Sequence, residues 1–258
     1  MIFNYDLRRQ PVTFDFVTFL TLCEQERLLM QKESFYVYIN PEVNNFQKTA
    51  CYDWKWRITH LLMPLAMMMP NCCGVGIGTK GRSLGYRTKD IQKEVYFDKS
   101  FKHITAGETA LNIAYKTQNL ITLRQRRWTP ERNSNLEAWR DAFIGEPYSL
   151  IEDLEVYPRV ENINVEVRMA MYMQADMNWG VANGCGALWV FNPTIPYRVF
   201  KIVTEGVTCT SKSHIKAATG MNIGDQPHIA TENQKYIWMD DTKEAIREEL
   251  KVISSKPS

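Results

Sequence analysis

The fold of this chain is decided by residues 119–143, NLITLRQRRWTPERNSNLEAWRDAF. The segment Asn119–Leu123 is apolar and contains β-branched residues, which predicts a buried strand. The polar, arginine-rich residues 124–135 lead into a stretch with helical apolar spacing, and we expect a helix from about Asn135 to Phe143. A buried strand, a loop and a helix in this order form the repeating unit of an open α/β sheet.

Extended and helical segments alternate along the rest of the chain. Upstream, we expect a helix over Phe14–Met30 capped by Thr13, a strand over Phe35–Ile39, a helix over Asp53–Met63 interrupted by Pro64, a short extended piece over Val75–Ile77, and a helix over Thr105–Lys116. Downstream, we expect a strand near Leu154–Tyr157, a helix over Asn164–Ala175, a loop over Asn178–Gly186, strands over Tyr197–Val203 and Tyr236–Trp238, and a last helix from Asp240 or Asp241 through Leu250. Strands separated by helices predict parallel sheets covered on both faces.

The two halves of the chain are alike in kind, and a length of 258 residues allows one large domain or two small ones. The segment His103–Lys116 gives way to the arginine-rich part of the chain, so we place a boundary near residue 116. We expect two small α/β domains, residues 1–116 and 117–258, facing a cleft. One doubly wound α/β domain is the alternative.

Composition narrows the class of protein. Apolar residues make up 45% and charged residues 23% of the chain, which is ordinary for a globular protein, and the net charge of +2 gives no general field for nucleic acid. No apolar run reaches the roughly 20 residues of a transmembrane helix, and the N-terminus lacks a signal-peptide pattern. Six cysteines without C-x-x-C spacing and four histidines predict no metal site and reduced thiols in a cytoplasmic protein.

Four arginines follow the predicted strand that ends at Leu123, namely Arg124, Arg126, Arg127 and Arg132. Ligands of open α/β sheets bind outside the carboxyl ends of the strands. Guanidinium groups bind phosphate oxygens in pairs, and the start of a helix also favours anions. We therefore predict diphosphate binding here, with Arg132–Asn135 at the start of the next helix. The alternative is a solvated basic loop.

A second candidate is Asn178–Gly186, NWGVANGCG, with three glycines in seven residues. Glycine lets backbone amides approach a ligand closely, and asparagine side chains can bind hydroxyl groups. The alternative is a tight turn. Weaker candidates are the G-x-G-x-x-G stretch Gly76–Gly81, the polar loop Gly224–His228, which we expect to be a surface turn, and His60, which we expect to be structural. Asp53, Asp98 and Glu205 are possible carboxylate bases that no spacing singles out.

Several stretches resemble, in order, a group of glycosyltransferase-like proteins found with bacterial surface-polysaccharide genes. They are Arg57-Ile58 with Pro64 and MPNC (69–72), ITLRQRRWTPERNSNLEAW (121–139), RMAMYMQADMNWGVANGCGALWVFN (168–192) and GDQPHIATENQKYIWMDDT (224–242). The downstream half of that group is similar in plan to the donor-binding half of GT-B glycosyltransferases, including the fucosyltransferase-like branch. The resemblance covers most of the chain.

The resemblance implies roles for particular residues. Arg124 matches the strand-terminal arginine that holds the donor diphosphate in fucosyltransferase-like enzymes, although their His-x-Arg reads Thr122-Leu123-Arg124 here. Four residues fall on the helix-loop pattern that lies near the nucleotide sugar, namely Asp176, Gly180, Asn183 and Gly184.

Together these observations predict a compact GT-B-like pair of Rossmann-like parallel-sheet domains. Residues 1–116 would be the acceptor side and residues 117–258 the nucleotide-sugar side of a glycosyltransferase with a hydroxyl or glycan acceptor, in surface-glycan synthesis. The nucleotide sugar would be the co-substrate, with no other cofactor and no nucleic-acid partner. The expected substrate-binding residues are Arg124, Arg132, Asn133, Asn135, Asn178, Asn183, Gly184 and Gly186, and a carboxylate or histidine of the first half would be the base.

Three other classes of function remain open from the sequence. One is a non-catalytic carbohydrate- or nucleotide-binding relative. Another is a nicotinamide-dependent oxidoreductase that uses Gly76–Gly81. The third is a purely structural assembly protein.

Overall fold

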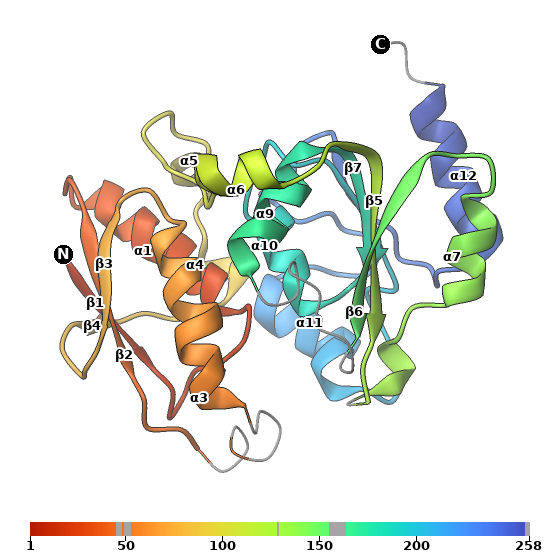
Figure 1. The fold of residues 1–258 in the computed structure, drawn as a ribbon. Coiled ribbons are helices and arrows are strands. Elements are labelled where there is room, and N and C mark those ends of the chain that lie inside the picture. Colours follow the sequence, from red (N-terminus) through yellow and green to blue (C-terminus); the bar gives the residue numbers. More distant parts are fainter. Residues whose placement is uncertain (45–47, 49–52, 128, 155–163, 256–258) are drawn as a thin grey trace.

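The computed structural model describes residues 1–44, 48, 53–127, 129–154 and 164–255 (Figure 1). It contains two β-sheets in which every pair of neighbouring strands is parallel. The first sheet has the order β3-β2-β1-β4 and the second has the order β6-β5-β7-β8-β9. Helices lie between the two sheets, so the expected α/β fold with two Rossmann-like parallel sheets is confirmed.

The first sheet is built from the N-terminal part of the chain. Its elements are β1 (Ile2–Asp6), α1 (Phe16–Leu29), β2 (Phe35–Asn40), α3 (Trp54–Arg57), the π-helical turn η1 (Ile58–Leu62), α4 (Met63–Met67), β3 (Cys72–Ile77) and β4 (Arg82–Ser83). Pro64 lies in the first turn of α4, where its missing N–H is not needed, so the helical path continues to Met67 instead of stopping.

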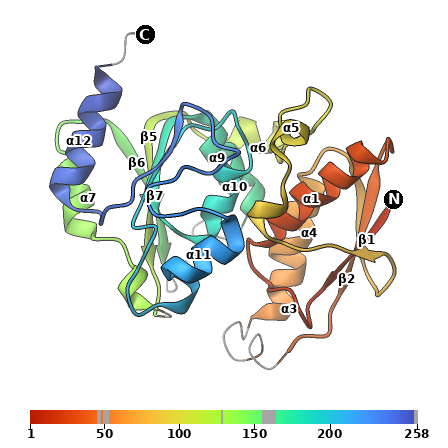
Figure 2. The same ribbon diagram turned by 180° about the vertical axis from the view of Figure 1, so that it is seen from behind.

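The second sheet follows after three short helical segments, η2 (Thr88–Asp90), α5 (Lys93–Tyr96) and α6 (Glu108–Ile113). Its elements are β5 (Thr117–Gln125), η3 (Pro130–Arg132), α7 (Leu136–Ala142), β6 (Tyr148–Leu154), α9 (Val165–Gln174), β7 (Ala175–Val181), η4 (Gly184–Gly186), α10 (Ala187–Val190), β8 (Tyr197–Phe200), η5 (Thr208–Thr210), α11 (Lys212–Thr219), β9 (Gln234–Tyr236) and α12 (Lys243–Ser254). Helices α7 and α12 cover its outer face, while α9 and α10 lie between the two sheets (Figures 1 and 2).

Some strands differ from the sequence predictions. The segment Asn178–Gly186 is not a loop throughout, because β7 runs on to Val181 and is buried on both faces, which removes the period-two pattern of a strand. Strand β6 ends at Leu154, before most of the predicted segment, and residues 155–157 lie outside the described residues. Strand β1 was not predicted at all.

Helix ends also differ from the predictions. Helix α6 is shorter than expected and has Gly107, not Thr105, at its N-cap. The cap of α12 is Thr242, whose side chain accepts a hydrogen bond from the Ala245 amide, and the helix runs on past Leu250 to Ser254. Such ends depend on which nearby polar group reaches the free amides, and several candidates stand side by side in the sequence.

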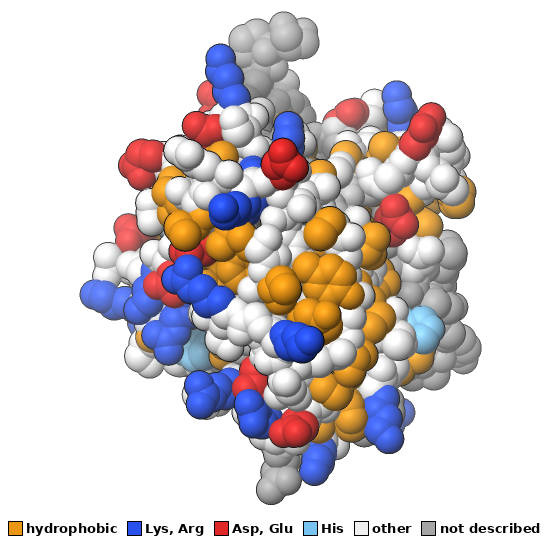
Figure 3. All heavy atoms as spheres, turned by 90° about the vertical axis from the view of Figure 1, so that its left-hand side faces the viewer, with side chains coloured by type: hydrophobic (Ala, Val, Ile, Leu, Met, Phe, Trp, Pro, Cys, Tyr) orange, Lys and Arg blue, Asp and Glu red, His pale blue; other side chains and the backbone are white. Residues whose placement is uncertain are grey.

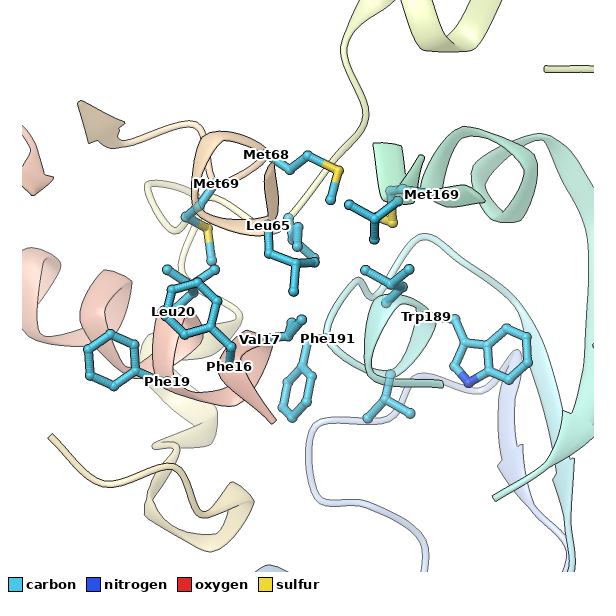
Figure 4. Close-up of a cluster of buried hydrophobic side chains, with 14 of the residues drawn as sticks. Phe16, Val17, Phe19, Leu20, Leu65, Met68, Met69, Met169, Trp189 and Phe191 are labelled. Carbon is cyan, nitrogen blue, oxygen red and sulfur yellow. The ribbon is translucent and has the colours of Figure 1, made fainter. Parts of the chain in front are cut away.

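The two sheets share one apolar core (Figure 4). One buried cluster contains side chains from both parts of the chain. Its members include Phe16, Val17 and Leu20 of α1, Leu65 of α4, and Met169, Trp189 and Phe191 near the second sheet. A buried hydrogen bond from Asn192 Nδ2 to the Ile104 carbonyl, 2.8 Å long, also ties the two parts together. The predicted division into an acceptor-side part (1–116) and a nucleotide-sugar part (117–258) stays a prediction, and its boundary falls directly before β5.

Within the described part of the chain, no helix is long and apolar enough to cross a membrane. The described cysteines are free thiols. Among the same residues, no group of three or more histidine, cysteine, aspartate or glutamate side chains is placed to hold a metal ion.

Gly180 provides a test of how tightly β7 packs. A Cβ atom at this position would lie 2.9 Å from the Thr122 carbonyl oxygen and 3.3 Å from the Trp189 ring. Because the first of these atoms belongs to the backbone and has little room to move, we expect Gly180→Ala to lower the free energy of unfolding by about 1–3 kcal/mol in urea titrations. Gly85→Ala, where the methyl group would meet only the end of the Asp90 side chain at 3.3 Å, is the matched control. Equal stabilities of the two variants would contradict this reading of Gly180.

Candidate functional site

A cavity of about 410 Å³ lies between the carboxyl edge of the second sheet and the start of α1. The second half contributes the end of β7, the turn 182–187 and α11, and the first half contributes Thr13, Asp15 and Thr18. In the order β6-β5-β7, the chain changes direction across the sheet between β5 and β7. Ligands of doubly wound sheets bind beside such a switch point, and the volume is within the range of ligand sites.

Arg132 is the arginine of the predicted group that lines this cavity. Its guanidinium donates to the Ala182 carbonyl at 3.0 Å and contacts Cys209 Sγ at 3.4 Å. Among the described residues, no carboxylate lies within 4.0 Å of it, so its charge is not neutralised by an ion pair. His214 of α11 lines the same cavity. An anionic ligand in this cavity would therefore meet the Arg132 guanidinium, with the Asp15 carboxyl group in the same lining.

Arg124, by contrast, is buried at the end of β5 and lies outside the cavity lining. Its guanidinium donates to the Thr129 carbonyl at 3.0 Å, to Thr129 Oγ1 at 3.0 Å and to Asn133 Oδ1 at 2.5 Å. Thr129 has a positive φ of 53°, a conformation that is unfavourable for a branched residue. Arg124 therefore holds the loop in a strained path, and its predicted contact with a diphosphate stays a prediction.

Asn133 makes further hydrogen bonds within this loop. Its Oδ1 also accepts from the Arg126 amide at 2.9 Å, and its Nδ2 donates to the Arg126 carbonyl at 3.1 Å. Lys201 Nζ donates to the Asn133 carbonyl at 3.1 Å. Asn133 does not line the cavity, and these bonds fix the backbone next to Arg132.

Asn135 and Asn178 also lie outside the cavity lining. Asn135 caps α7 by accepting from the Ala138 amide at 3.2 Å. Asn178 is fully buried in β7, where its Nδ2 donates to the Tyr172 carbonyl at 2.9 Å and the Pro196 carbonyl at 3.1 Å. These positions give both residues structural roles, and binding of substrate by them stays a prediction.

The turn after β7 does reach the cavity, through Asn183, Gly184 and Gly186. The Gly184 amide donates to Asn183 Oδ1 at 2.7 Å and the Gly186 amide donates to the Asn183 carbonyl at 3.0 Å, so both amides are used within the turn. A Cβ on Gly184 would lie 3.4 Å from Phe14, and one on Gly186 would lie 2.9 Å from Trp189 Nε1. These glycines let the turn pack closely.

Asp15, which no sequence pattern singled out, lies at the N-cap of α1 in place of the predicted Thr13. Its side chain accepts from Thr13 Oγ1 at 2.7 Å and faces the cavity. Asp15 is exposed to solvent, but the protein packed around its carboxyl group raises its pKa, and the hydrogen bond from Thr13 and the charges of His214 and Arg132 partly oppose that rise. Asp15 is close to His214 and Arg132 only in the folded chain, so the sequence carried no signal for it.

The loop Gly224–His228 is not simply a surface turn, because Pro227 and His228 line the cavity. His228 Nε2 lies 2.9 Å from the Ile91 carbonyl of the first half and links the two halves. His60 is exposed, stacks on Trp56 with ring centroids 4.6 Å apart and does not line the cavity.

The stretch Gly76–Gly81 lacks the helix that a dinucleotide fingerprint requires. It runs from the end of β3 to β4, and no helix opens on it.

Comparison with known proteins identifies a solved structure with a similar fold. No protein-family model matches the chain, and no curated protein matches it either. Among solved structures, the chain is similar to the crystal structure of the glycosyl transferase family 9 from Veillonella parvula DSM 2008, with a TM-score of 0.51 and 11% sequence identity over 97% of this chain and 90% of that chain. This similarity confirms the predicted GT-B-like α/β fold.

The bonding of Arg124 predicts a loss of stability when it is replaced. Arg124→Ala removes three hydrogen bonds from a buried charged group, and we expect the free energy of unfolding to fall by about 2–4 kcal/mol. Arg124→Lys keeps the charge but lacks the planar fork of donors, so we expect a similar loss. Urea unfolding measures both, with the exposed Arg9→Ala as the control. A stability of Arg124→Ala within about 0.5 kcal/mol of that control would contradict the structural role.

Proposed function

We propose that this chain is a glycosyltransferase that moves a sugar from a nucleotide-diphosphate donor in this cavity to a hydroxyl acceptor. The observation that carries the proposal is the Arg132 guanidinium, which is not paired with a described carboxylate and shares the cavity wall with the Asp15 carboxyl group. The GT-B-like fold and the position of the cavity at the carboxyl edge of the second sheet support it.

Arg132 and His214 are the proposed ligands of the donor diphosphate. A guanidinium binds two phosphate oxygens with parallel hydrogen bonds and keeps its charge at all working pH values. When the bond between the sugar and the diphosphate breaks, negative charge grows on the leaving oxygen. A cation already fixed in place by the Ala182 carbonyl stabilises that charge without reorganising during the reaction.

Asp15 is the proposed general base. It would take the proton of the acceptor hydroxyl while that oxygen attacks the anomeric carbon, and the electron pair of the broken bond would leave on the diphosphate. Because desolvation raises the pKa of Asp15, its carboxylate is a stronger base than an ordinary aspartate. The acceptor would enter from the side of the first half, which supplies this residue.

The finer parts of the proposal come from the sequence resemblance. We propose a nucleotide sugar as the co-substrate, with no other cofactor, and a glycan acceptor in surface-polysaccharide synthesis within the cytoplasm.

The first test concerns the donor. A thermal-shift screen against GDP-, UDP-, ADP- and CMP-sugars should raise the melting temperature of the wild type with at least one of them. Arg132→Ala should weaken binding of that compound by about 10- to 100-fold, since a charge-assisted contact is lost, while urea unfolding changes little. Arg9→Ala, an exposed arginine away from the cavity, should bind like the wild type. Unchanged affinity in Arg132→Ala would refute this assignment.

The second test concerns the base. Asp15→Asn should reduce turnover by roughly 10²- to 10⁴-fold and leave donor affinity nearly unchanged. The base acts only when deprotonated, so wild-type turnover should rise with pH through the raised pKa of Asp15, at a pH above the ordinary aspartate value of about 3.9. The residual turnover of Asp15→Asn should lack this fall at acid pH, the acid limb of the pH profile. Glu205→Gln, outside the cavity lining, should behave as the wild type, and an acid limb that persists in Asp15→Asn would assign the base elsewhere.

A further inference from the structure

The outer face of the first sheet is not covered by any described helix. Helices α1 and α4 lie on the side of this sheet that faces the second sheet, and the two ribbon views agree on this (Figures 1 and 2). Figure 3 looks onto the opposite side and shows apolar side chains gathered at its centre. Parallel sheets are normally covered on both faces, so an open apolar face of this kind needs an explanation.

Two tyrosine rings are the main feature of this face. Along β2, Phe35, Val37 and Ile39 point inward and are buried in the core, whereas Tyr36 and Tyr38 alternate with them and are half-buried. The centroids of the two tyrosine rings are 4.9 Å apart, and the ring planes are tilted by 49°. Exposed Ile2 of β1 stands on the same side of the sheet, since Ile2 pairs with Tyr36.

A row of glycines makes room for these rings. In the pairing of β2 with β3, Tyr36 stands beside Gly74 and Tyr38 beside Gly76. A Cβ at Gly74 would lie 2.6 Å from the Tyr36 ring, and one at Gly78 would lie 2.8 Å from the Tyr38 ring. The glycines therefore let both rings extend over the edge strand, with no β3 side chain between them and the solvent at these positions. This use accounts for Gly76 and Gly78 of the stretch Gly76–Gly81 without a bound nucleotide.

We propose that this face binds a carbohydrate chain, with successive sugars stacked on Tyr36 and Tyr38. A tyrosine offers an apolar ring face and a polar hydroxyl tip, which suits a pyranose that has an apolar C–H face and a rim of hydroxyl groups. The 4.9 Å ring spacing is close to the length of one pyranose unit in an extended glycan. The site lies across the sheet from α1 and α4, away from the cavity, and does not depend on the proposed transferase activity.

The size of the face favours a glycan over a second protein. Four strands about 4.8 Å apart, the longest of five or six residues at about 3.3 Å each, present on the order of 350 Å². A stable protein interface buries about 800 Å² on each partner. A single extended glycan needs only a strip of about the width of the two rings, and it leaves the surrounding charged side chains in water.

Affinity electrophoresis of the full chain tests this proposal, with gels that contain hydroxyethyl cellulose, xylan or dextran. The wild type should be retarded by at least one of them. The double substitution Tyr36→Ala with Tyr38→Ala should reduce that affinity at least about 10-fold, because both stacking faces are lost, whereas Tyr36→Phe with Tyr38→Phe should retain most of it. Tyr148→Ala, an exposed tyrosine of the second sheet, is the matched control and should bind normally.

A second variant guards against misfolding of the double alanine form. Gly76→Ala would place a methyl group 2.7 Å from Tyr36 Oη, which displaces the Tyr36 ring but keeps both tyrosines, so it should also weaken retardation. Arg132→Ala and Asp15→Asn should be retarded like the wild type, which separates this proposal from the proposed transferase.

Four results would overturn the proposal. The first is that none of the three polymers retards the wild type, and the second is that the double alanine variant is retarded as much as the wild type. The third is a dimer in sedimentation that the double alanine substitution dissociates. The fourth is co-sedimentation with phosphatidylglycerol vesicles that the double alanine substitution abolishes. The third would assign the face to a second copy, and the fourth to a lipid surface.

Discussion

The apolar packing of α1 and α4 against the helices of the second sheet is the interaction on which the rest of the structure depends. Phe16, Leu65, Met169 and Trp189 belong to one buried cluster that crosses from one half to the other. Burying apolar surface contributes roughly 25 cal/mol per Å², so a continuous core fixes the distance between the sheets. The cavity takes its walls from both halves, and this core is what keeps Asp15 opposite the carboxyl edge of the second sheet.

At that edge, two arginines, one at the start of the loop after β5 and one within it, have different structural roles. Arg124 is buried, and its guanidinium donates to Thr129 and Asn133 of the loop, where Thr129 has a left-handed backbone conformation. Arg132 follows in the same loop, and its guanidinium is anchored on the Ala182 carbonyl while its charge faces the cavity. Binding loses less free energy when the charged group is already oriented than when the ligand must order it. The hydrogen bonds of Arg124 within the loop therefore matter for binding at Arg132.

The two sheets are covered unequally, and this difference separates the two proposed sites. The second sheet has helices on both faces and offers its carboxyl edge, where polar groups of several loops meet around a cavity. In the described part of the chain, the first sheet has helices on one face only, and on its other face tyrosines lie beside glycines of the edge strand. The edge suits a small charged ligand, and the flat aromatic face suits an extended neutral one.

The sequence by itself determined the features that arise from local order. The alternation of strands and helices, the strand before Arg124 and the helix that Asn164 caps all follow from periodicity and capping within short windows. Tertiary structure alone decided that β7 extends to Val181, because a strand buried on both faces has no alternation to read. It also decided which arginine of the loop faces the cavity and that Asp15 and His214 line the same cavity, since these residues come from distant parts of the chain and are brought together only by the shared core.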